Sequence, residues 1–122
     1  MFRKLRTVIY HTPDLEKAKE WYIKITGVQP YFNEAYYVGF NIYGCELGLD
    51  PDISSLKSGT QSVAYWKVDD IAESMATLKA NGAKVISEIA EVGEGIKVAI
   101  IQDPFGNALG LIEESLLDLE AS

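Results

Sequence analysis

The chain has 122 residues, of which 48% are apolar and 24% are charged, and its net charge is −7. This length predicts one domain or two half-size modules that share a core. The single cysteine excludes a disulfide within the chain and every all-cysteine zinc site. The excess of acidic residues argues against a nucleic-acid partner, because phosphate binding needs a basic surface.

No apolar run approaches the roughly 20 residues that a membrane-spanning helix needs. The first residues, Met1 to Lys4, lack the apolar stretch and the cleavage site of a signal peptide. We therefore expect a soluble, cytoplasmic protein with no membrane partner.

An apolar strand is expected from Thr7, and a helix follows it. Asp14 is a plausible N-cap, and Gly27 can end the helix. Between them, apolar residues recur at the spacing of one helix face. These are Leu15, Ala18, Trp21, Tyr22 and Ile25.

Three short strands are predicted next, at residues 28–32, 36–42 and 45–50, with a hairpin turn at Tyr43-Gly44. Residues 51–60 show no periodicity and contain several serine, threonine, glycine and proline residues. We interpret them as a linker.

The second half repeats this order. An apolar strand from Val63 leads through Asp69-Asp70 into a helix whose buried face carries Ile71, Met75 and Leu78 and which Gly82 ends. Strands are expected at residues 83–86, 96–102 and 108–112, with a turn at 103–107 between the last two. The tail, 113–122, contains three leucines and is a candidate for a short docking helix. The sequence therefore predicts two βαβββ modules.

This repeat resembles the vicinal oxygen chelate superfamily, which includes glyoxalase I, bleomycin resistance proteins and extradiol, ring-cleaving dioxygenases. The most specific residues are Asp14-Leu15-Glu16-Lys17-Ala18 with Trp21-Tyr22 and Gly27, Val68-Asp69-Asp70-Ile71 with Leu78 and Gly82, and Asp103-Pro104-Phe105-Gly106-Asn107. The resemblance implies an α+β, glyoxalase-like fold in which the two modules form a cupped eight-stranded sheet with the helices outside. Module one would span 1–50, the linker 51–60 and module two 61–122. Family members commonly pair their modules between chains, so a homodimer is also implied.

Strand alternation then predicts which side chains line the cavity, since residues i and i+2 share a face. From this set we expect ligand contacts by His11, Tyr37, Asn41, Glu46, Asp50, Tyr65 and Lys67.

Metal-dependent members of the superfamily hold one divalent ion with four side chains. The resemblance carries these positions to Thr7, Glu46, Val63 and Gly110. Only Glu46 has suitable chemistry, because threonine is a poor ligand and valine and glycine offer no donor. We therefore predict no metal and no other cofactor; a divalent ion is expected only if this assignment is wrong.

His11 and Glu46 are the candidates for catalytic residues. His11 is the only histidine, and its simpler interpretation is a partly exposed side chain bonded to backbone or water. Glu46 is a relic ligand, a carboxylate for a cationic ligand, or an exposed acid. In an apolar cup its pKa would be raised, which would make it a candidate base.

Tyr37 and Tyr65 can form stacking walls for a planar or cationic ligand, although packing in the core or in a dimer interface explains such aromatics equally well. Lys67 is either a cavity residue or a solvated lysine at the rim. Cys45 is expected to be a structural thiol, because no neighbouring base is visible to form a thiolate.

The leading hypothesis is metal-independent binding or sequestration of a small planar or cationic molecule, as in the bleomycin-resistance branch. The alternative is a metal-dependent lyase, isomerase or dioxygenase of the same superfamily. A third is a structural or regulatory partner without a ligand.

Overall fold

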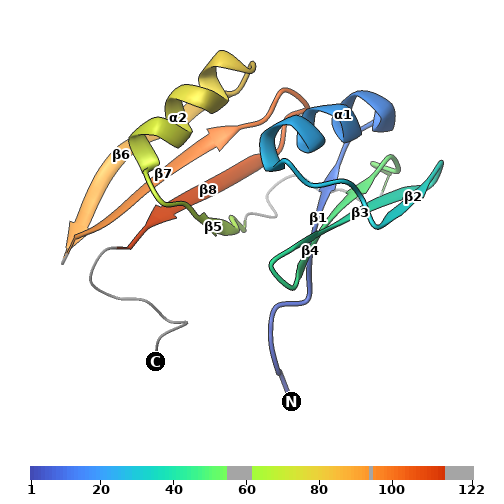
Figure 1. Cartoon of the computed structure of the whole chain (residues 1–122), viewed down its shortest axis with the longest axis horizontal. Coiled ribbons are helices and arrows are strands. Elements are labelled where there is room, and N and C mark those ends of the chain that lie inside the picture. The colour runs from blue at the N-terminus through green and yellow to red at the C-terminus, as the bar shows by residue number, and fades with distance from the viewer. Residues whose placement is uncertain (55–61, 94, 115–122) are drawn as a thin grey trace. The chain divides into compact units, whose positions relative to one another are not determined.

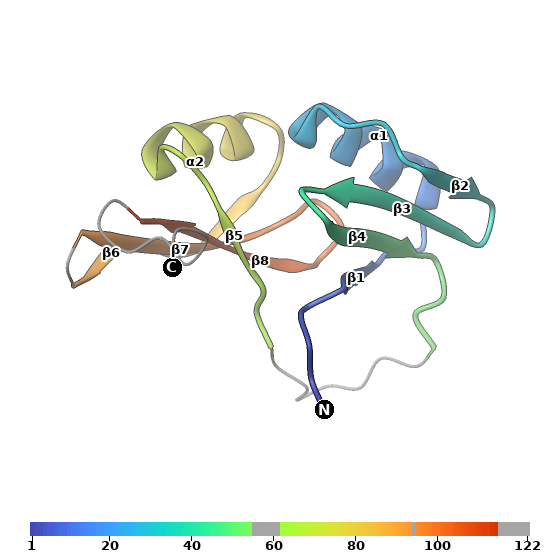
Figure 2. The same cartoon turned by 60° about the horizontal axis from the view of Figure 1, so that its bottom comes forward.

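The structure is a computed structural model, and it describes residues 1–54, 62–93 and 95–114. The chain divides into two compact units, Met1–Thr60 and Gln61–Ser122. Figures 1 and 2 show that each unit has one helix over one face of one sheet. The docking helix predicted for the tail lies outside the described residues, apart from Glu113 and Glu114.

The first unit has one helix, α1, and a four-stranded sheet in the order β1-β4-β3-β2. Strand β1 runs parallel to β4, and the other neighbours are antiparallel. Its elements are β1 (Thr7–His11), α1 (Leu15–Thr26), β2 (Phe32–Glu34), β3 (Tyr37–Ile42) and β4 (Cys45–Asp50).

The second unit repeats this topology with the order β5-β8-β7-β6. Strand β5 is parallel to β8, and the other pairs are antiparallel. Its elements are β5 (Tyr65–Lys67), α2 (Ile71–Ala80), β6 (Lys84–Gly93), β7 (Ile96–Gln102) and β8 (Ala108–Glu113).

The α+β class and the two βαβββ modules are therefore confirmed. The eight described strands belong to two four-stranded sheets, each with its own hydrogen-bonded ladder, and the sheets are not closed. None of the described helices is long and apolar enough to cross a membrane.

The helix ends lie where the sequence places them. The Asp14 carboxylate accepts the Lys17 N–H, and Gly27 ends α1 with a φ of 72°, a left-handed conformation that glycine adopts without strain. Asp70 accepts the Glu73 N–H in the same way, and α2 ends at Ala80, with Asn81 as its C-cap and Gly82 following with a φ of 94°.

Three strand predictions need correction. The strand expected at 28–32 pairs only from Phe32 to Glu34, because Gly27 has just ended a helix and Pro30 has no N–H to donate. The strand expected at 83–86 continues to Gly93, since a hairpin with β7 extends it across several register shifts. The strand expected from Val63 is confined to Tyr65–Lys67.

Alternation in the first sheet separates a packed face from a polar face, as predicted. Tyr10, Val38, Phe40, Leu47 and Leu49 are buried. The Tyr10 ring stacks on Tyr22 of α1 with centroids 6.0 Å apart, and the Tyr22 ring also lies 6.5 Å from Phe40. The core of this unit therefore lies between α1 and the sheet, and the opposite face of the sheet faces away from α1.

In the second unit, helix α2 contributes three buried residues: Ile71, Met75 and Leu78. The sheet contributes four more: Ala99, Ile101, Leu109 and Leu111. The two modules thus use the same layering.

The turn between β7 and β8 is built around the buried carboxylate of Asp103. Its Oδ1 accepts the backbone N–H groups of Phe105 at 2.9 Å and Asn107 at 2.8 Å. The Asn107 amide also donates to Oδ2 at 3.1 Å, and Gly106 adopts a φ of 96°. The side chain thereby satisfies donors that the turn cannot satisfy within the sheet.

We expect Asp103→Ala to destabilise the second unit by about 1–3 kcal/mol, because it leaves backbone N–H groups without an acceptor. Urea unfolding in a Trp21→Phe background, where Trp66 fluorescence reports on this unit, measures the effect. The exposed Asp69→Ala is the control, expected to change stability by less than about 0.5 kcal/mol. Equal effects of the two variants would contradict the role given to Asp103.

Candidate functional site

The polar face of the first sheet carries the candidate site. In the ladder, Thr7 lies opposite Glu46 and Glu46 opposite Asn41. Gly39 and Gly48 face each other in the next row of this face. Neighbours across a ladder share a face, so the register places side chains from β1, β4 and β3 together.

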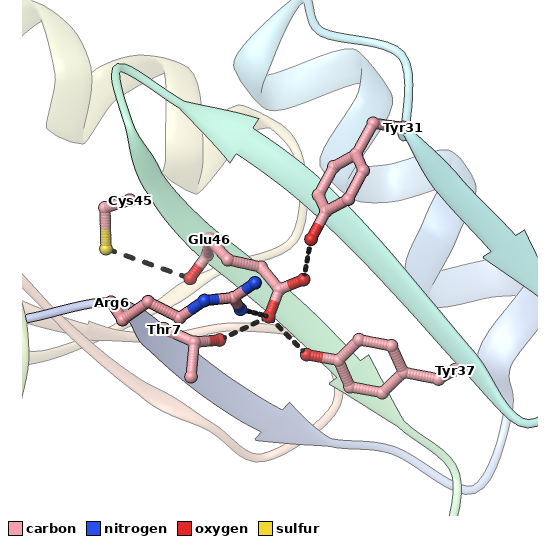
Figure 3. Close-up of polar contacts among 6 residues, drawn as sticks. All are labelled: Arg6, Thr7, Tyr31, Tyr37, Cys45 and Glu46. Atoms are coloured by element: carbon pink, nitrogen blue, oxygen red, sulfur yellow. Dashed lines mark hydrogen bonds and ion pairs between the residues drawn. The ribbon is translucent and has the colours of Figure 1, made fainter.

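The Glu46 carboxylate is the centre of this face (Figure 3). Its Oε1 accepts the Thr7 hydroxyl at 2.6 Å, the Tyr37 hydroxyl at 2.8 Å and Nη1 of Arg6 at 3.1 Å. Its Oε2 accepts the Tyr31 hydroxyl. Four donors from four positions therefore converge on one carboxylate.

Glu46 is a buried charged residue that is stabilised in its ionised form. Burial raises its pKa, but the hydrogen bonds from Thr7, Tyr31 and Tyr37, together with the Arg6 charge, outweigh burial and hold the pKa below its ordinary value. The expectation of a raised pKa is therefore wrong, because the surroundings of the carboxylate are hydrogen-bond donors rather than an apolar cup. A carboxylate so stabilised is a weak base.

The pKa values of the two tyrosine hydroxyls shift in the opposite direction, upwards. Burial, followed by the hydrogen bond to Glu46, raises the pKa of Tyr37 to about 12. The hydrogen bond to Glu46 is also the main cause of the raised pKa of Tyr31. Both hydroxyls hold their protons at neutral pH and remain donors to Glu46.

Two glycines make room for these side chains. A Cβ at Gly48 would lie 1.9 Å from the Tyr37 hydroxyl oxygen, and a Cβ at Gly39 would lie 2.7 Å from Oε2 of Glu46. Neither distance is compatible with a side chain at that position. The Tyr37 ring therefore lies against bare backbone, and its hydroxyl reaches the carboxylate.

Aromatic rings surround this network on its β2 side. The Phe32 ring lies 6.0 Å from Tyr36 and 6.2 Å from Tyr37, in edge-on and tilted arrangements. Tyr31 is 58% exposed and Tyr36 is 67% exposed. We name Tyr31, Phe32, Tyr36 and Tyr37 the aromatic cluster.

His11 lies on the same strand as Thr7 but at its other end, opposite Asp50. Its Nδ1 donates to the Asp52 carbonyl at 3.0 Å. Four residues of extended strand, about 13 Å, separate it from the row of Glu46. The two predicted catalytic candidates are thus not brought into direct contact, which proton transfer between them would require.

Asp50 and Asn41 have local structural contacts. Oδ1 of Asp50 accepts the Asp52 N–H at 2.8 Å. The Asn41 amide oxygen accepts the Gly44 N–H at 2.8 Å, which holds the predicted Tyr43-Gly44 turn. Both central residues of that turn have positive φ, 49° and 88°, as a tight hairpin requires.

Cys45 is half-buried, and its Sγ lies 3.8 Å from the backbone oxygen of Glu46. The thiol therefore contacts the main chain and not the carboxylate (Figure 3).

The remaining predicted residues belong to the second unit. Tyr65 is 46% exposed, and its ring lies against Gly110, where a Cβ would come within 2.5 Å of Cδ2. Lys67 is exposed on the same short strand. The predicted pairing of Tyr65 with Tyr37 joins side chains of two separate units and stays a prediction.

Arg6 and Tyr31 are site residues that the sequence analysis missed. Four of the seven residues from 31 to 37 are aromatic, and this density is a sequence signal that points to Tyr31. Arg6 precedes the first strand, where alternation does not apply. Its carbonyl nevertheless accepts the Glu46 N–H at 2.8 Å, which extends the ladder by one bond.

The four positions that the resemblance assigns to a divalent ion do not fit one. Val63 and Gly110 have no donor atom in their side chains. The Thr7 hydroxyl donates a hydrogen bond to Glu46. The two carboxylate oxygens of Glu46 together already accept hydrogen bonds from four side chains. Among the described residues, no group of three His, Cys, Asp or Glu side chains is arranged to hold a metal ion.

We expect Glu46→Gln to lower the free energy of unfolding of the first unit by about 2 kcal/mol at neutral pH, because charge-assisted bonds are lost. The folded-state pKa of Glu46 is lowered, so its contribution is complete above the ordinary value of 4.5 and is lost as the pH falls through the folded-state value. The difference from wild type should therefore shrink below pH 4.5.

Unfolding followed by Trp21 fluorescence in a Trp66→Phe background measures this difference across pH. Glu34→Gln, at an exposed acid of β2, is the matched control. A Glu46→Gln effect that persists unchanged in acid would contradict the stabilised carboxylate.

Gly48→Ala should displace the Tyr37 ring, since the added methyl group overlaps its hydroxyl end. We expect a loss of about 1 kcal/mol, the value of the hydrogen bond to Glu46. In a Tyr37→Ala background the same substitution should cost much less, and a double-mutant cycle measures this coupling. Additive effects would show that Tyr37 does not depend on Gly48.

The sequence matches the model of the Glyoxalase/Bleomycin resistance protein/Dioxygenase superfamily over residues 4–111. No curated protein matches the sequence. Solved structures with the same fold include a glyoxalase/bleomycin resistance protein/dioxygenase family enzyme from Burkholderia phytofirmans, with a TM-score of 0.78 and 18% identity over 93% of this chain and 100% of that chain.

A second similar structure is a glyoxalase-related enzyme from Fulvimarina pelagi, with a TM-score of 0.73 and 16% identity over 93% of this chain and 89% of that chain. A third is a lactoylglutathione lyase from Agrobacterium tumefaciens, with a TM-score of 0.72 and 20% identity over 93% of this chain and 95% of that chain. These likenesses establish the fold and no activity. Because the family match spans most of the sequence, the chain belongs to the Glyoxalase/Bleomycin resistance protein/Dioxygenase superfamily.

Proposed function

We propose that the protein binds a small planar molecule without a metal, on the polar face of the first sheet beside Glu46 and the aromatic cluster. The observation that carries this proposal is the Glu46 carboxylate, whose two oxygens accept donors from Arg6, Thr7, Tyr31 and Tyr37. Hydrogen-bond donors of the protein itself thus occupy the positions beside this carboxylate that a metal ion would otherwise take.

The donor set supports binding in preference to metal-dependent chemistry. An ion that entered at Glu46 would have to displace hydrogen bonds that stabilise a buried charge. It would gain no side-chain ligand from Val63 or Gly110. The lyase, isomerase or dioxygenase alternative therefore requires ligands other than these four positions.

The aromatic cluster supports a planar ligand. Tyr31 and Tyr36 are largely exposed, and the Phe32 ring packs against both Tyr36 and Tyr37. Aromatic faces favour offset stacking on other flat groups, and each such contact is worth about 0.5–1.5 kcal/mol beyond the buried area.

The expected attraction of Glu46 for a cationic ligand is weakened by an ion pair within the chain. Nη1 of Arg6 lies 3.1 Å from Oε1 of Glu46, so the carboxylate charge is compensated locally. Planarity is therefore the ligand property that the face supports best. The homodimer and the cytoplasmic location stay predictions.

We expect the flat neutral compound 2-naphthamide to bind, with a dissociation constant by calorimetry that is the same in excess EDTA as after addition of nickel, zinc, manganese or iron. Tyr36→Ala should weaken binding about fivefold, through the loss of one aromatic contact. Tyr36 has no bond to Glu46 among the described contacts, so the carboxylate network is left intact.

Tyr43→Ala is the matched control, since Tyr43 is fully exposed in the turn at the other end of β3. Binding that appears only with metal would support the catalytic alternative. No binding under any condition would favour a structural or regulatory role.

A further inference from the structure

Arg6 is held in place by both its backbone and its side chain. Its carbonyl accepts the Glu46 N–H at 2.8 Å, and its Nη1 bonds Oε1 of the same residue at 3.1 Å. Figure 3 shows the guanidinium beside the carboxylate. A long side chain fixed at both ends keeps less rotational freedom than a free surface arginine, so it loses less when a ligand binds.

The guanidinium also faces solvent. The Arg6 side chain is 70% exposed, whereas Glu46 is 9% exposed. A guanidinium has five N–H groups in a planar fork, and its bond to Glu46 uses Nη1. The exposed part of the fork can therefore donate to a second acceptor.

The aromatic cluster adjoins this fork. Tyr31 and Arg6 both donate to the Glu46 carboxylate. Arg6 is also close enough that its charge partly offsets the rise in the pKa of the Tyr31 hydroxyl. Phe32 follows Tyr31 directly and packs against Tyr36. A flat ligand on these rings can thus place a substituent at the guanidinium.

We propose that Arg6 and the aromatic cluster bind a planar oxyanion, such as an aromatic carboxylate, with the two oxygens on the guanidinium fork and the ring on the aromatic cluster. Guanidinium groups bind carboxylates through two parallel N–H···O bonds, which fixes the ligand in the plane of the fork. This inference rests on the proposed function, because it names the ligand class for the same face.

The negative net charge of the protein does not prevent an anion from binding at this face. The net charge is −7, but charges beyond about 8 Å are largely screened at physiological ionic strength. Within that range Arg6 offers N–H donors to an anion, whereas the oxygens of Glu46 are already bonded to the chain's own donors.

Three flat compounds of one shape test the proposal: 2-naphthoate, 2-naphthamide and 2-naphthamidinium, which carry negative, no and positive charge. By calorimetry, we expect 2-naphthoate to bind about tenfold more tightly than the amidinium, as charge-assisted bonds to a guanidinium imply. Arg6→Gln should remove this preference, because 2-naphthoate loses more affinity than 2-naphthamide when the charged fork is lost. Arg6→Lys, which keeps the charge without the fork, should lie between the two.

Arg3→Gln is the matched control, because Arg3 is exposed in the same N-terminal segment. Circular dichroism establishes that each variant is folded. An equal loss of 2-naphthoate affinity in Arg3→Gln and Arg6→Gln would overturn the role of Arg6, as would tighter binding of the amidinium.

The outcomes separate this inference from the function it rests on. If 2-naphthamide binds and 2-naphthoate binds no better, planar binding stands and the oxyanion inference fails. If none of the three compounds binds, the proposed function fails and the oxyanion inference fails with it.

Discussion

The buried carboxylate of Glu46 is the constraint on which the polar face of the first unit depends. An ionised carboxylate can be buried only when its oxygens are satisfied, and here Arg6, Thr7, Tyr31 and Tyr37 donate to it. The same bonds orient two tyrosine rings and one guanidinium, which are the groups that the proposed function assigns to ligand binding. Glu46 thus holds these groups in place, and its lowered pKa follows from the donors and the Arg6 charge around it.

Glycine is the second requirement of this arrangement. Gly48 lies under Tyr37 in the first unit, and Gly110 lies under Tyr65 in the second. In both units a tyrosine on the face away from the helix lies against a glycine in the last strand. The repeat seen in the sequence therefore extends from the topology to a ring-on-backbone contact. Gly110 also occupies a position that the resemblance assigns to a metal ligand.

Membership of the superfamily establishes the fold, while the site must be argued from its own residues. The solved structures with this fold share at most a fifth of their residues with the chain in the comparisons described above. Within that fold, a carboxylate bonded to the chain's own donors supports our proposal that a ligand is recognised by stacking and charge. Under the proposed function, the Arg6 guanidinium is the positive group at this face.

The sequence by itself determined the order of the helices and strands, the helix ends and the face on which Glu46, Tyr37 and Thr7 lie. These follow from local rules: Asp14 and Gly27 end a helix through bonds to near neighbours, and strand alternation depends only on position. The tertiary structure alone decided the direction of the Glu46 pKa and the presence of Arg6 and Tyr31 at the site. Those features depend on donors from residues 6 to 37 meeting at one carboxylate, and such a meeting arises from strand register and close packing that no single stretch of sequence records.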